Sequence, residues 1–270
     1  MKIIRTVASL RQALDARPPG SAVGFVPTMG ALHDGHVALI RAARAACRQV
    51  VVSIFVNPKQ FNDAGDLARY PRHESRDTEM ADEAGTDILF MPEPAEVYPD
   101  GHATSLHMTG PALGFEGDHR PGHFDGVAIV CLKLFAMVQP DVVFLGQKDA
   151  QQVAVLRQLV RDVNLRLELR VVPTVRDLNG LAISSRNARL SIEERSRAVA
   201  IPLALVAGLT AYRAGDDPVA AAQAALRGLG VDYVGMVTFD GQPTLVIAAR
   251  AGATRLIDNV PLDQPELAGL

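Results

Sequence analysis

The chain has 270 residues, of which 48% are hydrophobic, and its formal net charge is −3. This length predicts two domains, or one domain with a sizeable appendage, and the apolar content is sufficient for a full core. The acidic balance argues against sequence-independent binding of nucleic acid. Arg5 and Arg11 interrupt the apolar residues at the start, which argues against a secretory signal, and we find no run of about 18 apolar residues that would span a membrane. Cys47 and Cys131 are too few for a disulfide framework, so we expect a cytoplasmic protein with no membrane partner.

Hydrophobic periodicity predicts alternating strands and helices over the first two thirds of the chain. We expect strands at 22–28, 49–56, 87–92, 141–146 and 165–175, and helices at 34–47, 73–84, 124–138 and 149–163. The polar segment 57–72 reads as a loop. Apolar residues at every second position from Leu165 to Val171 predict a strand near the sheet edge. Repeated strand–helix–strand units predict an α/β fold with a Rossmann-like, doubly wound parallel sheet.

The last third of the chain has a different pattern. Helices are expected at 191–213 and 217–228, followed by strand-like runs at 232–239 and 243–257 that the turn "DGQP" joins. We therefore expect a Rossmann-like domain over 1–174 and a smaller C-terminal α+β domain over 175–270. Ligands of parallel α/β sheets bind beyond the carboxyl ends of strands. The segments 25–36, 57–60 and 146–152 follow such ends, which predicts that they converge on one cleft.

A pair of histidines stands where the strand at 22–28 gives way to a helix. His33 and His36 are spaced i, i+3 and share one face of the first helical turn. A helix start has unpaired N–H groups and a partial positive charge, which suit a phosphate, and Gly30 and Gly35 allow close approach. A nucleotide phosphate site is one interpretation. Two surface histidines, one capping the helix, are another. Metal ligation by both histidines and Asp34 is a third, which the orientation of Asp34 disfavours.

The string "PTMGALHDGH" at 27–36 closely resembles the pantoate–β-alanine ligase family, and "HDGH" resembles the HxGH element of the nucleotidyltransferase superfamily. Matches continue in the same order with "FVNPKQF" at 55–61, "YPR" at 70–72, "RPGHF" at 120–124, "LGQKDAQQ" at 145–152, "VPTVR" at 172–176, "SSRN" at 184–187 and "TRLIDN" at 254–259. The resemblance implies an ATP-dependent ligase that condenses pantoate with β-alanine through a pantoyl-adenylate, releasing AMP and pyrophosphate. It also implies a homodimer.

By this resemblance the ATP site has three parts. The first is Met29, Gly30, Ala31, Leu32, His33, Asp34, Gly35 and His36; the second is Gly146, Gln147, Lys148 and Asp149; the third is Val175, Ile183, Ser184, Ser185 and Arg186. Four of these residues are the implied catalytic groups. His36 would be the proton donor with His33 as its partner, while Lys148 and Arg186 would neutralise phosphate charge. Asp149 would contact the ribose, and Val175 would contact the adenine through its backbone.

The resemblance also assigns residues to the substrates and to a metal. Gln60 and Gln152 would hold pantoate, because an amide both donates and accepts hydrogen bonds without adding charge. Asn57 and Arg120 would lie near the substrates. Gln151 is the neighbour of Gln152, and only one of the two should point into a cleft. Mg²⁺ is expected with ATP, and Asp77 matches a metal-binding aspartate of the family, although it also reads as a solvent-facing helix charge.

Two further expectations concern motion and assembly. The segment 61–72, with Gly65 as a possible hinge, should close the cleft, because an acyl-adenylate must be kept from water. The apolar helix at 124–138, or the adjoining strands, could supply a symmetric dimer contact. The chain departs from the family at Ala150, where many members have tyrosine, and at Gln147, where glutamate is common. The segment "VGMVTFDGQPTLVI" also looks short between its strands.

Two other functions compete with the ligase. A pantetheine-phosphate adenylyltransferase would need a basic pocket for a phosphorylated acceptor, whereas Gln60 and Gln152 suit an unphosphorylated acid. A non-catalytic nucleotide-binding regulator would need affinity but no groups for a transition state. A tRNA synthetase fits poorly, because the tail is small and the net charge is negative.

Overall fold

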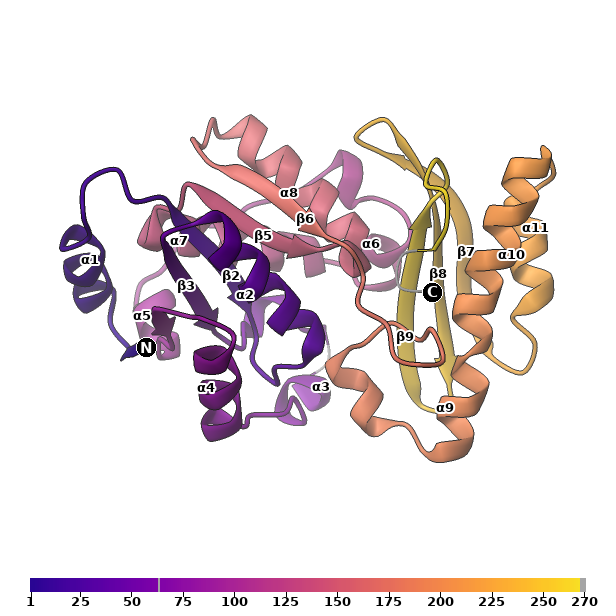
Figure 1. Cartoon of the computed structure of the whole chain (residues 1–270), viewed down its shortest axis with the longest axis horizontal. Helices are drawn as coiled ribbons and strands as arrows, with labels where there is room; N and C mark the ends of the chain where they lie inside the picture. Colours follow the sequence, from indigo (N-terminus) through magenta and orange to yellow (C-terminus); the bar gives the residue numbers. More distant parts are fainter. Residues whose placement is uncertain (63, 268–270) are drawn as a thin grey trace. The chain divides into compact units, whose positions relative to one another are not determined.

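The structure, a computed structural model, describes residues 1–62 and 64–267. Contacts between residues group the chain into two compact units (Figure 1). Unit 1 contains residues 1–145 and 151–172, and unit 2 contains residues 146–150 and 173–270. Each unit has a hydrophobic core of its own. The expected domain boundary at 174 stays a prediction.

Unit 1 is built on a six-stranded sheet. In spatial order the strands are β1 (Lys2–Ile4), β4 (Ile88–Phe90), β3 (Gln49–Ile54), β2 (Val23–Thr28), β5 (Val142–Gly146) and β6 (Glu168–Val172). The pairs β1–β4, β4–β3, β3–β2 and β2–β5 are parallel. The predicted doubly wound α/β sheet is confirmed, and β6 lies at the sheet edge as its alternating pattern predicted.

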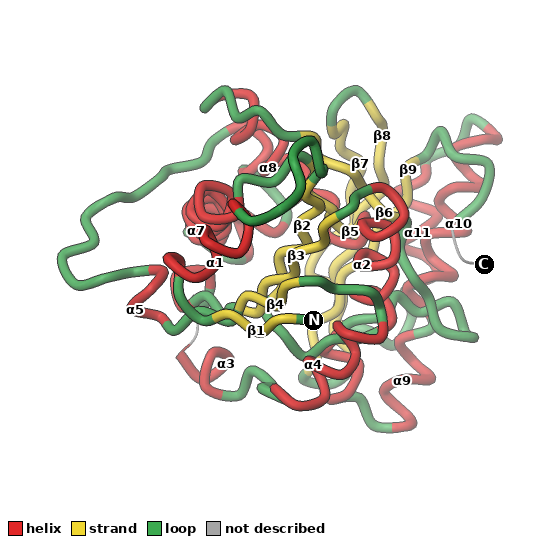
Figure 2. The backbone as a smooth tube through the Cα atoms, turned by 60° about the vertical axis from the view of Figure 1, so that its left-hand side comes forward, coloured by secondary structure: helices red, strands yellow, loops and turns green. Residues whose placement is uncertain are grey.

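Helices cover both faces of this sheet (Figure 2). Phe25 packs with α1 (Val7–Asp15), α7 (His123–Val138) and α8 (Ala150–Asp162), while its neighbour Val26 packs with α2 (Asp34–Ala46) and α4 (Glu74–Glu83). Successive strand residues point to opposite faces, so a continuous apolar strand must be covered on both sides. The shorter connecting helices are η1 (Pro58–Gln60), α3 (Ala64–Ala68), α5 (Pro94–Val97), η2 (Gly110–Ala112) and α6 (Glu116–His119).

Three expectations about unit 1 need correction. The strand β1 and helix α1 were not predicted. The segment 57–72, predicted as a loop, contains η1 and α3, and its residue Asp63 lies outside the described residues. The apolar side chains of α7 lie in the core of unit 1, so this helix does not offer an apolar face for a symmetric contact.

Unit 2 contains an antiparallel sheet of β7 (Gly230–Phe239), β8 (Gln242–Ala251) and β9 (Thr254–Pro261). Asp240 and Gly241 have φ of 50° and 82°, and they form the two-residue hairpin turn that "DG" favours. This tight turn explains the short connection noted in the sequence. The run predicted as one strand at 243–257 is two strands, because Gly252, with φ of 60°, turns the chain between β8 and β9.

The remaining elements of unit 2 are η3 (Gln147–Asp149), η4 (Ser185–Arg189), α9 (Ile192–Ala198), α10 (Ala200–Ala214) and α11 (Pro218–Ala225). The stretch Ile192–Ala214 is long and apolar enough to cross a membrane by length and composition alone. In the structure Ile201, Leu205 and Leu209 of this stretch lie in the core of unit 2. A core helix passes the same test of length and composition, so the stretch is weak evidence for a membrane span.

Candidate active site

The histidine pair forms a reciprocal cap at the start of α2. His33 is the N-cap residue, and its Nδ1 accepts a hydrogen bond from the Gly35 N–H at 3.2 Å. In return, His36 Nδ1 accepts from the His33 N–H at 3.3 Å, and the two ring centroids are 4.0 Å apart. Because both Nδ1 atoms accept, a neutral ring carries its proton on Nε2. The capping interpretation is therefore confirmed, and it fixes which nitrogen each ring can use to donate.

The backbone N–H groups at the start of α2 already have partners within the chain. They are the N–H groups of Gly30, Ala31, Leu32, His33, Gly35, His36 and Val37. The expectation that this helix start presents unpaired N–H groups to a phosphate is wrong at these seven positions. The two imidazoles accept from two of these N–H groups, and a carboxylate distant in the sequence accepts from two more. The other three donate to the Thr28 hydroxyl and the His33 carbonyl.

That carboxylate belongs to Asp77 of α4, whose side chain is 2% exposed. Its Oδ2 accepts from the Ala31 N–H at 2.8 Å, and its Oδ1 accepts from the Leu32 N–H at 2.7 Å. Gly30 has φ of 79°, and a Cβ there would lie 3.0 Å from Asp77 Oδ2 and from Ile54 Cγ2. Asp77 therefore holds the loop between β2 and α2 in a conformation that needs glycine at position 30.

These contacts do not fit a resident magnesium site at Asp77. Each of its oxygens already accepts a backbone hydrogen bond, and the side chain is buried. Across residues 1–62 and 64–267, no group of three or more His, Cys, Asp or Glu side chains is placed to hold a metal ion. The interpretation as a solvent-facing charge is also wrong. The alternative of a metal bound by His33, Asp34 and His36 gains no support, because these three side chains do not form such a group in the described part of the chain.

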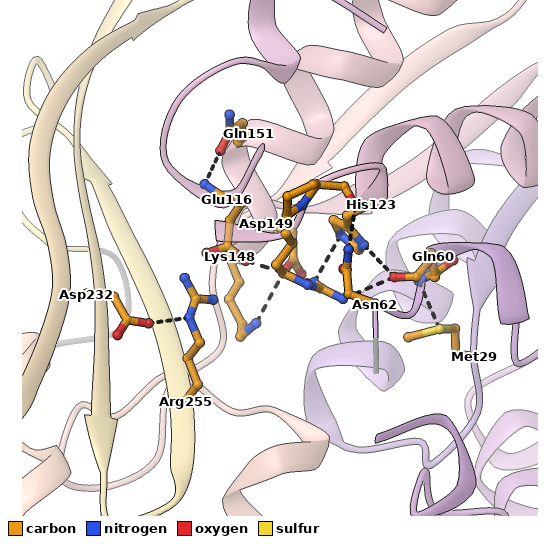
Figure 3. Close-up of polar contacts among 12 residues, drawn as sticks. Met29, Gln60, Asn62, Glu116, His123, Lys148, Asp149, Gln151, Asp232 and Arg255 are labelled. Atoms are coloured by element: carbon orange, nitrogen blue, oxygen red, sulfur yellow. Dashed lines mark hydrogen bonds and ion pairs between the residues drawn. The ribbon is translucent and has the colours of Figure 1, made fainter. Parts of the chain in front are cut away.

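Gln60 lies at the end of η1, beyond the carboxyl end of β3, and its side chain joins a series of hydrogen bonds from Asn57 to Met29. Figure 3 shows the contact with Met29. Asn57 Oδ1 accepts from the Lys59 N–H at 3.3 Å, and its Nδ2 donates to the Gly126 carbonyl at 2.9 Å. These two backbone groups fix the orientation of the Asn57 amide. Its Nδ2 also donates to Gln60 Oε1 at 3.0 Å, so Gln60 Nε2 faces the Met29 Sδ atom, 3.0 Å away.

Tyr98 adds a hydrogen bond to Asn57 that the sequence did not indicate. Its hydroxyl donates to Asn57 Oδ1 at 2.9 Å, and burial raises the pKa of Tyr98, which keeps the hydroxyl protonated. Thioether sulfur is a weak acceptor, so Gln60 Nε2 is poised to donate to a stronger one. The Gln60 amide thus accepts from Asn57 through Oε1 and turns its donor end, Nε2, toward Met29.

Arg120 and His123 bind the backbone of the same residue. His123 Nδ1 lies 2.9 Å from the Gln60 carbonyl, and Arg120 Nη2 donates to that carbonyl at 3.3 Å. Arg120 Nη1 lies 3.0 Å from His123 Nε2, and Glu116 lies 3.9 Å from Arg120. Both side chains therefore hold η1 in place. His123 was missed as a functional candidate, although it stands in the matching string "RPGHF".

The neighbours Gln151 and Gln152 differ as expected for adjacent helix residues. Gln151 is buried, and its Nε2 donates to the carbonyls of Pro111, Leu113 and Gly114. Its Oε1 accepts from the Glu116 N–H at 3.0 Å (Figure 3). Gln152 is half-buried, and none of the described residues hydrogen-bonds its side chain. Gln151 is thus a structural residue, which leaves Gln152 as the substrate candidate.

Lys148 lies in unit 2, in the short helix η3. Its side chain is 17% exposed, and its Nζ lies 3.5 Å from Asp149 Oδ1 (Figure 3). The backbone carbonyls of Gln147 and Lys148 both accept from Asn259 Nδ2 at 2.9 Å, and Gln147 Nε2 donates to Asn259 Oδ1 at 3.0 Å. The Gln147 side chain, expected at the nucleotide, is therefore bonded to β9. Asn259 was missed, although it ends the matching string "TRLIDN".

The segment Ile183 to Arg186 is anchored within unit 2 through Ile183 and Ser184. The Ile183 N–H donates to the Val175 carbonyl at 2.9 Å, so this carbonyl of Val175 already has a partner. Ser184 Oγ donates to Asn187 Oδ1 at 2.6 Å, and Asn187 Nδ2 donates to the Ala182 carbonyl at 3.0 Å. Ser185 and Arg186 are half-buried. The Arg186 guanidinium makes no hydrogen bond or ion pair with any described residue, which suits an anionic ligand.

Comparisons with known proteins agree with these features. Residues 2–261 match the sequence profile of the family described as pantoate-beta-alanine ligase. The chain is 47% identical over 276 residues to a pantothenate synthetase of Cereibacter sphaeroides, which covers 96% of this chain and 99% of that protein. A crystal structure of the pantothenate synthetase of Thermus thermophilus superposes with a TM-score of 0.91 at 42% identity, covering 97% of this chain and 99% of that one. That of a pantoate-beta-alanine ligase of Francisella tularensis, complexed with beta-gamma ATP and beta-alanine, superposes with a TM-score of 0.86 at 33% identity and 98% coverage of both chains.

The doubly wound sheet and the family match over residues 2–261 together place this chain among the α/β enzymes that are AMP-forming ligases. More particularly, the chain belongs to the pantoate–β-alanine ligase family, whose members are AMP-forming ligases of pantothenate biosynthesis.

Proposed function

We propose that this chain condenses pantoate with β-alanine in two steps. A carboxylate oxygen of pantoate attacks the α-phosphorus of ATP, and pyrophosphate leaves. The amine of β-alanine then attacks the acyl carbon of the pantoyl-adenylate, AMP leaves, and the amine loses a proton. The observation that carries the proposal is the family match over residues 2–261. No enzyme nucleophile is required, so the protein orients the reactants and neutralises developing charge.

The histidine cap supplies hydrogen-bond donors to the phosphates in this proposal. Nδ1 of His33 and Nδ1 of His36 are used by the backbone, so the phosphate contacts are made through Nε2. Charge grows on the leaving pyrophosphate as the phosphorus–oxygen bond breaks, and a donor placed there stabilises that charge. His36 is the proposed proton donor and His33 its partner.

The proposed pantoate site uses the donor end of Gln60. Gln60 Nε2 exchanges its weak Met29 sulfur partner for an oxygen of pantoate, and Gln152 supplies a second uncharged amide. An uncharged pair leaves the carboxylate nucleophilic. Asn57 and Arg120 support this site by fixing the side chain and the backbone of Gln60.

Lys148 and Arg186 are also proposed to contact the phosphates of ATP. Lys148 neutralises phosphate charge, Arg186 offers a planar fork of donors to phosphate oxygens, and Asp149 accepts from the ribose hydroxyls. Ser185, Ile183 and Val175 complete the proposed nucleotide contacts. Mg²⁺ enters with ATP on its phosphates, where it screens their charge.

Location, assembly and closure of the site complete the proposal. The chain acts in the cytoplasm as a homodimer, which light scattering tests directly, since a chain mass of 28.8 kDa should double. The C-terminal domain over 175–270 closes over the nucleotide. The segment 61–72 closes the site to water, because an acyl-adenylate hydrolyses readily.

Isotope exchange tests the first step on its own. Labelled pyrophosphate should enter ATP only when pantoate is present, and AMP should accumulate only after β-alanine is added. Exchange that needs a phosphorylated acceptor in place of pantoate would indicate an adenylyltransferase. ATP binding without any exchange would indicate a nucleotide-binding regulator and would overturn the proposal.

A further inference from the structure

Asn259 of β9 holds the peptide groups on both sides of Lys148. Its Nδ2 donates to the Gln147 carbonyl, which precedes the Lys148 Cα, and to the Lys148 carbonyl, which follows it, each at 2.9 Å. One amide nitrogen therefore fixes both peptide planes that meet at this Cα. The direction in which the Lys148 side chain leaves the backbone is set by those planes.

The orientation of the Asn259 amide is itself determined. Two carbonyl oxygens can only accept, so Nδ2 must face them, and Oδ1 faces Gln147 Nε2 at 3.0 Å. Asn259 is 4% exposed. All three bonds join residues more than 100 positions apart in the chain, so the arrangement depends on the packed unit and not on local turn formation.

Asp258, the residue before Asn259, helps to hold the segment of unit 2 that carries Arg186. Asp258 makes a two-bond ion pair with Arg176, with distances of 2.6 Å and 3.1 Å, and both side chains are 1% exposed. Arg176 Nη1 also donates to the Gly180 carbonyl at 3.0 Å, and Arg176 pairs with Ala182 in a β-bridge. Arg176 thus fixes the turn that leads into Ile183 and Arg186. Asp258 Oδ1 in turn accepts from the Asn259 N–H at 2.8 Å.

We propose that Asp258 and Asn259 are positioning residues for catalysis, and that together they set the placement of Lys148 and Arg186 relative to each other. The inference rests on the proposed function, in which both cations neutralise ATP phosphates. A fixed spacing matters because misplacing a charged group by about 1 Å can cost about a hundredfold in rate. Neither Asp258 nor Asn259 need touch the nucleotide.

Asn259→Asp gives the sharper test, because it keeps the acceptor for Gln147 and removes both donors to the carbonyls. Its kcat should fall between about tenfold and about hundredfold, with the KM for β-alanine changed less than about twofold. The same substitution in a Lys148→Ala background should change kcat less than about twofold, because the lysine through which it acts is gone. Amide hydrogen exchange at 146–150 should become faster.

Asp232→Asn is the matched control, since it removes ion pairs from the same sheet without contacting residues 146–150. It should lower Tm and leave kcat unchanged. Equal losses of kcat from Asn259→Asp in both backgrounds would overturn the inference alone. Wild-type kcat in Lys148→Ala would overturn the proposed role of Lys148, and the inference with it. If Asn259→Asp fails to fold, Asn259→Ala measured by the same cycle and by hydrogen exchange decides the question.

Discussion

The cap uses Nδ1 of His36, whereas the proposed phosphate contact uses Nε2, so substitution can separate the two roles. Glutamine at this helix position can accept from the N-cap N–H, as in a capping box, but has no imidazole. His36→Gln should therefore keep Tm within about 2 °C of wild type and lower kcat by about a hundredfold or more. His36→Ala should show the same loss of kcat and lose about 1 kcal/mol of stability. Near wild-type turnover in His36→Gln, measured as pantoate-dependent AMP formation, would remove the ring from the chemistry.

A substitution of Asp77 can distinguish a structural role of its carboxylate from a role as a metal ligand. In Asp77→Asn one side-chain oxygen becomes an NH₂ group facing the Ala31 or Leu32 N–H, which should cost about 1–3 kcal/mol in the free energy of unfolding. The KM for ATP should rise because the loop that carries His33 loosens. The Mg²⁺ concentration for half-maximal rate should stay unchanged at saturating ATP. A shift of that concentration by about tenfold would make Asp77 a metal ligand after all.

At the scale of elements, the contact between α7 and η1 leaves no room for a side chain at Gly126. A Cβ at this position would lie 2.1 Å from the Lys59 carbonyl oxygen, and the Gly126 carbonyl accepts from Asn57. Gly126→Ala should therefore destabilise the chain by about 1–3 kcal/mol, although alanine favours a helix by about 1 kcal/mol. Because η1 carries Gln60, the KM for pantoate should rise more than the KM for ATP.

Gly230→Ala is the control, because its added Cβ would meet only Arg250 Cβ, at 3.7 Å. Its free energy of unfolding should stay within about 0.5 kcal/mol of wild type. If Gly126→Ala were equally silent, then α7 would not fix the position of η1.

The sheet of unit 2 carries a pH-dependent contribution to stability. Asp232 lies at a register shift in β7 and pairs with Arg250 of β8 and Arg255 of β9. Figure 3 shows the pair with Arg255. Burial raises the pKa of Asp232, but hydrogen bonds and charge from both arginines outweigh it and the net shift is downward. A lowered folded-state pKa stabilises above the ordinary value of about 4, and the contribution is lost as pH falls through the folded-state pKa.

Asp232→Asn should accordingly lower the free energy of unfolding at pH 7 by about 1–3 kcal/mol. The difference from wild type should shrink below about pH 4. Urea titrations at pH 7, 5 and 3.5 measure it. A difference that is the same at all three values would mean that the charge of Asp232 contributes nothing.

For the whole molecule, the proposed nucleotide contacts make a distinct prediction. Binding to the folded state alone stabilises it by about 2.7 kcal/mol at a ligand concentration of 100 Kd. Amide hydrogen exchange in the presence of a non-hydrolysable ATP analogue should become slower both at 29–37 of unit 1 and at 183–189 of unit 2. Protection confined to one of these segments would remove the other from the proposed nucleotide site.

The order of elements could be predicted because it depends on neighbouring residues. Apolar runs such as 49–56 and the period-two pattern from Leu165 to Val171 are local signals, and the structure confirms the strands they predicted. The short strand β1 and helix α1 were missed, because three residues of strand give little periodicity. The histidine pair could also be identified from the local sequence, since a helix start and an i, i+3 spacing both involve residues close together in the chain.

By itself the sequence determined the α/β class, the family resemblance and most of the candidate residues. Only the tertiary structure decided what those residues contact. Asp77 accepts hydrogen bonds from the backbone before His33, and Asn259 donates to the backbone at Lys148. Gln151 is buried and bonded to backbone carbonyls, whereas Gln152 is half-buried. The physical reason is the separation of the interacting residues along the sequence. Helix and strand patterns arise between residues a few positions apart, whereas these hydrogen bonds join residues between 37 and 111 positions apart. Such bonds form only when the packed core brings their partners together.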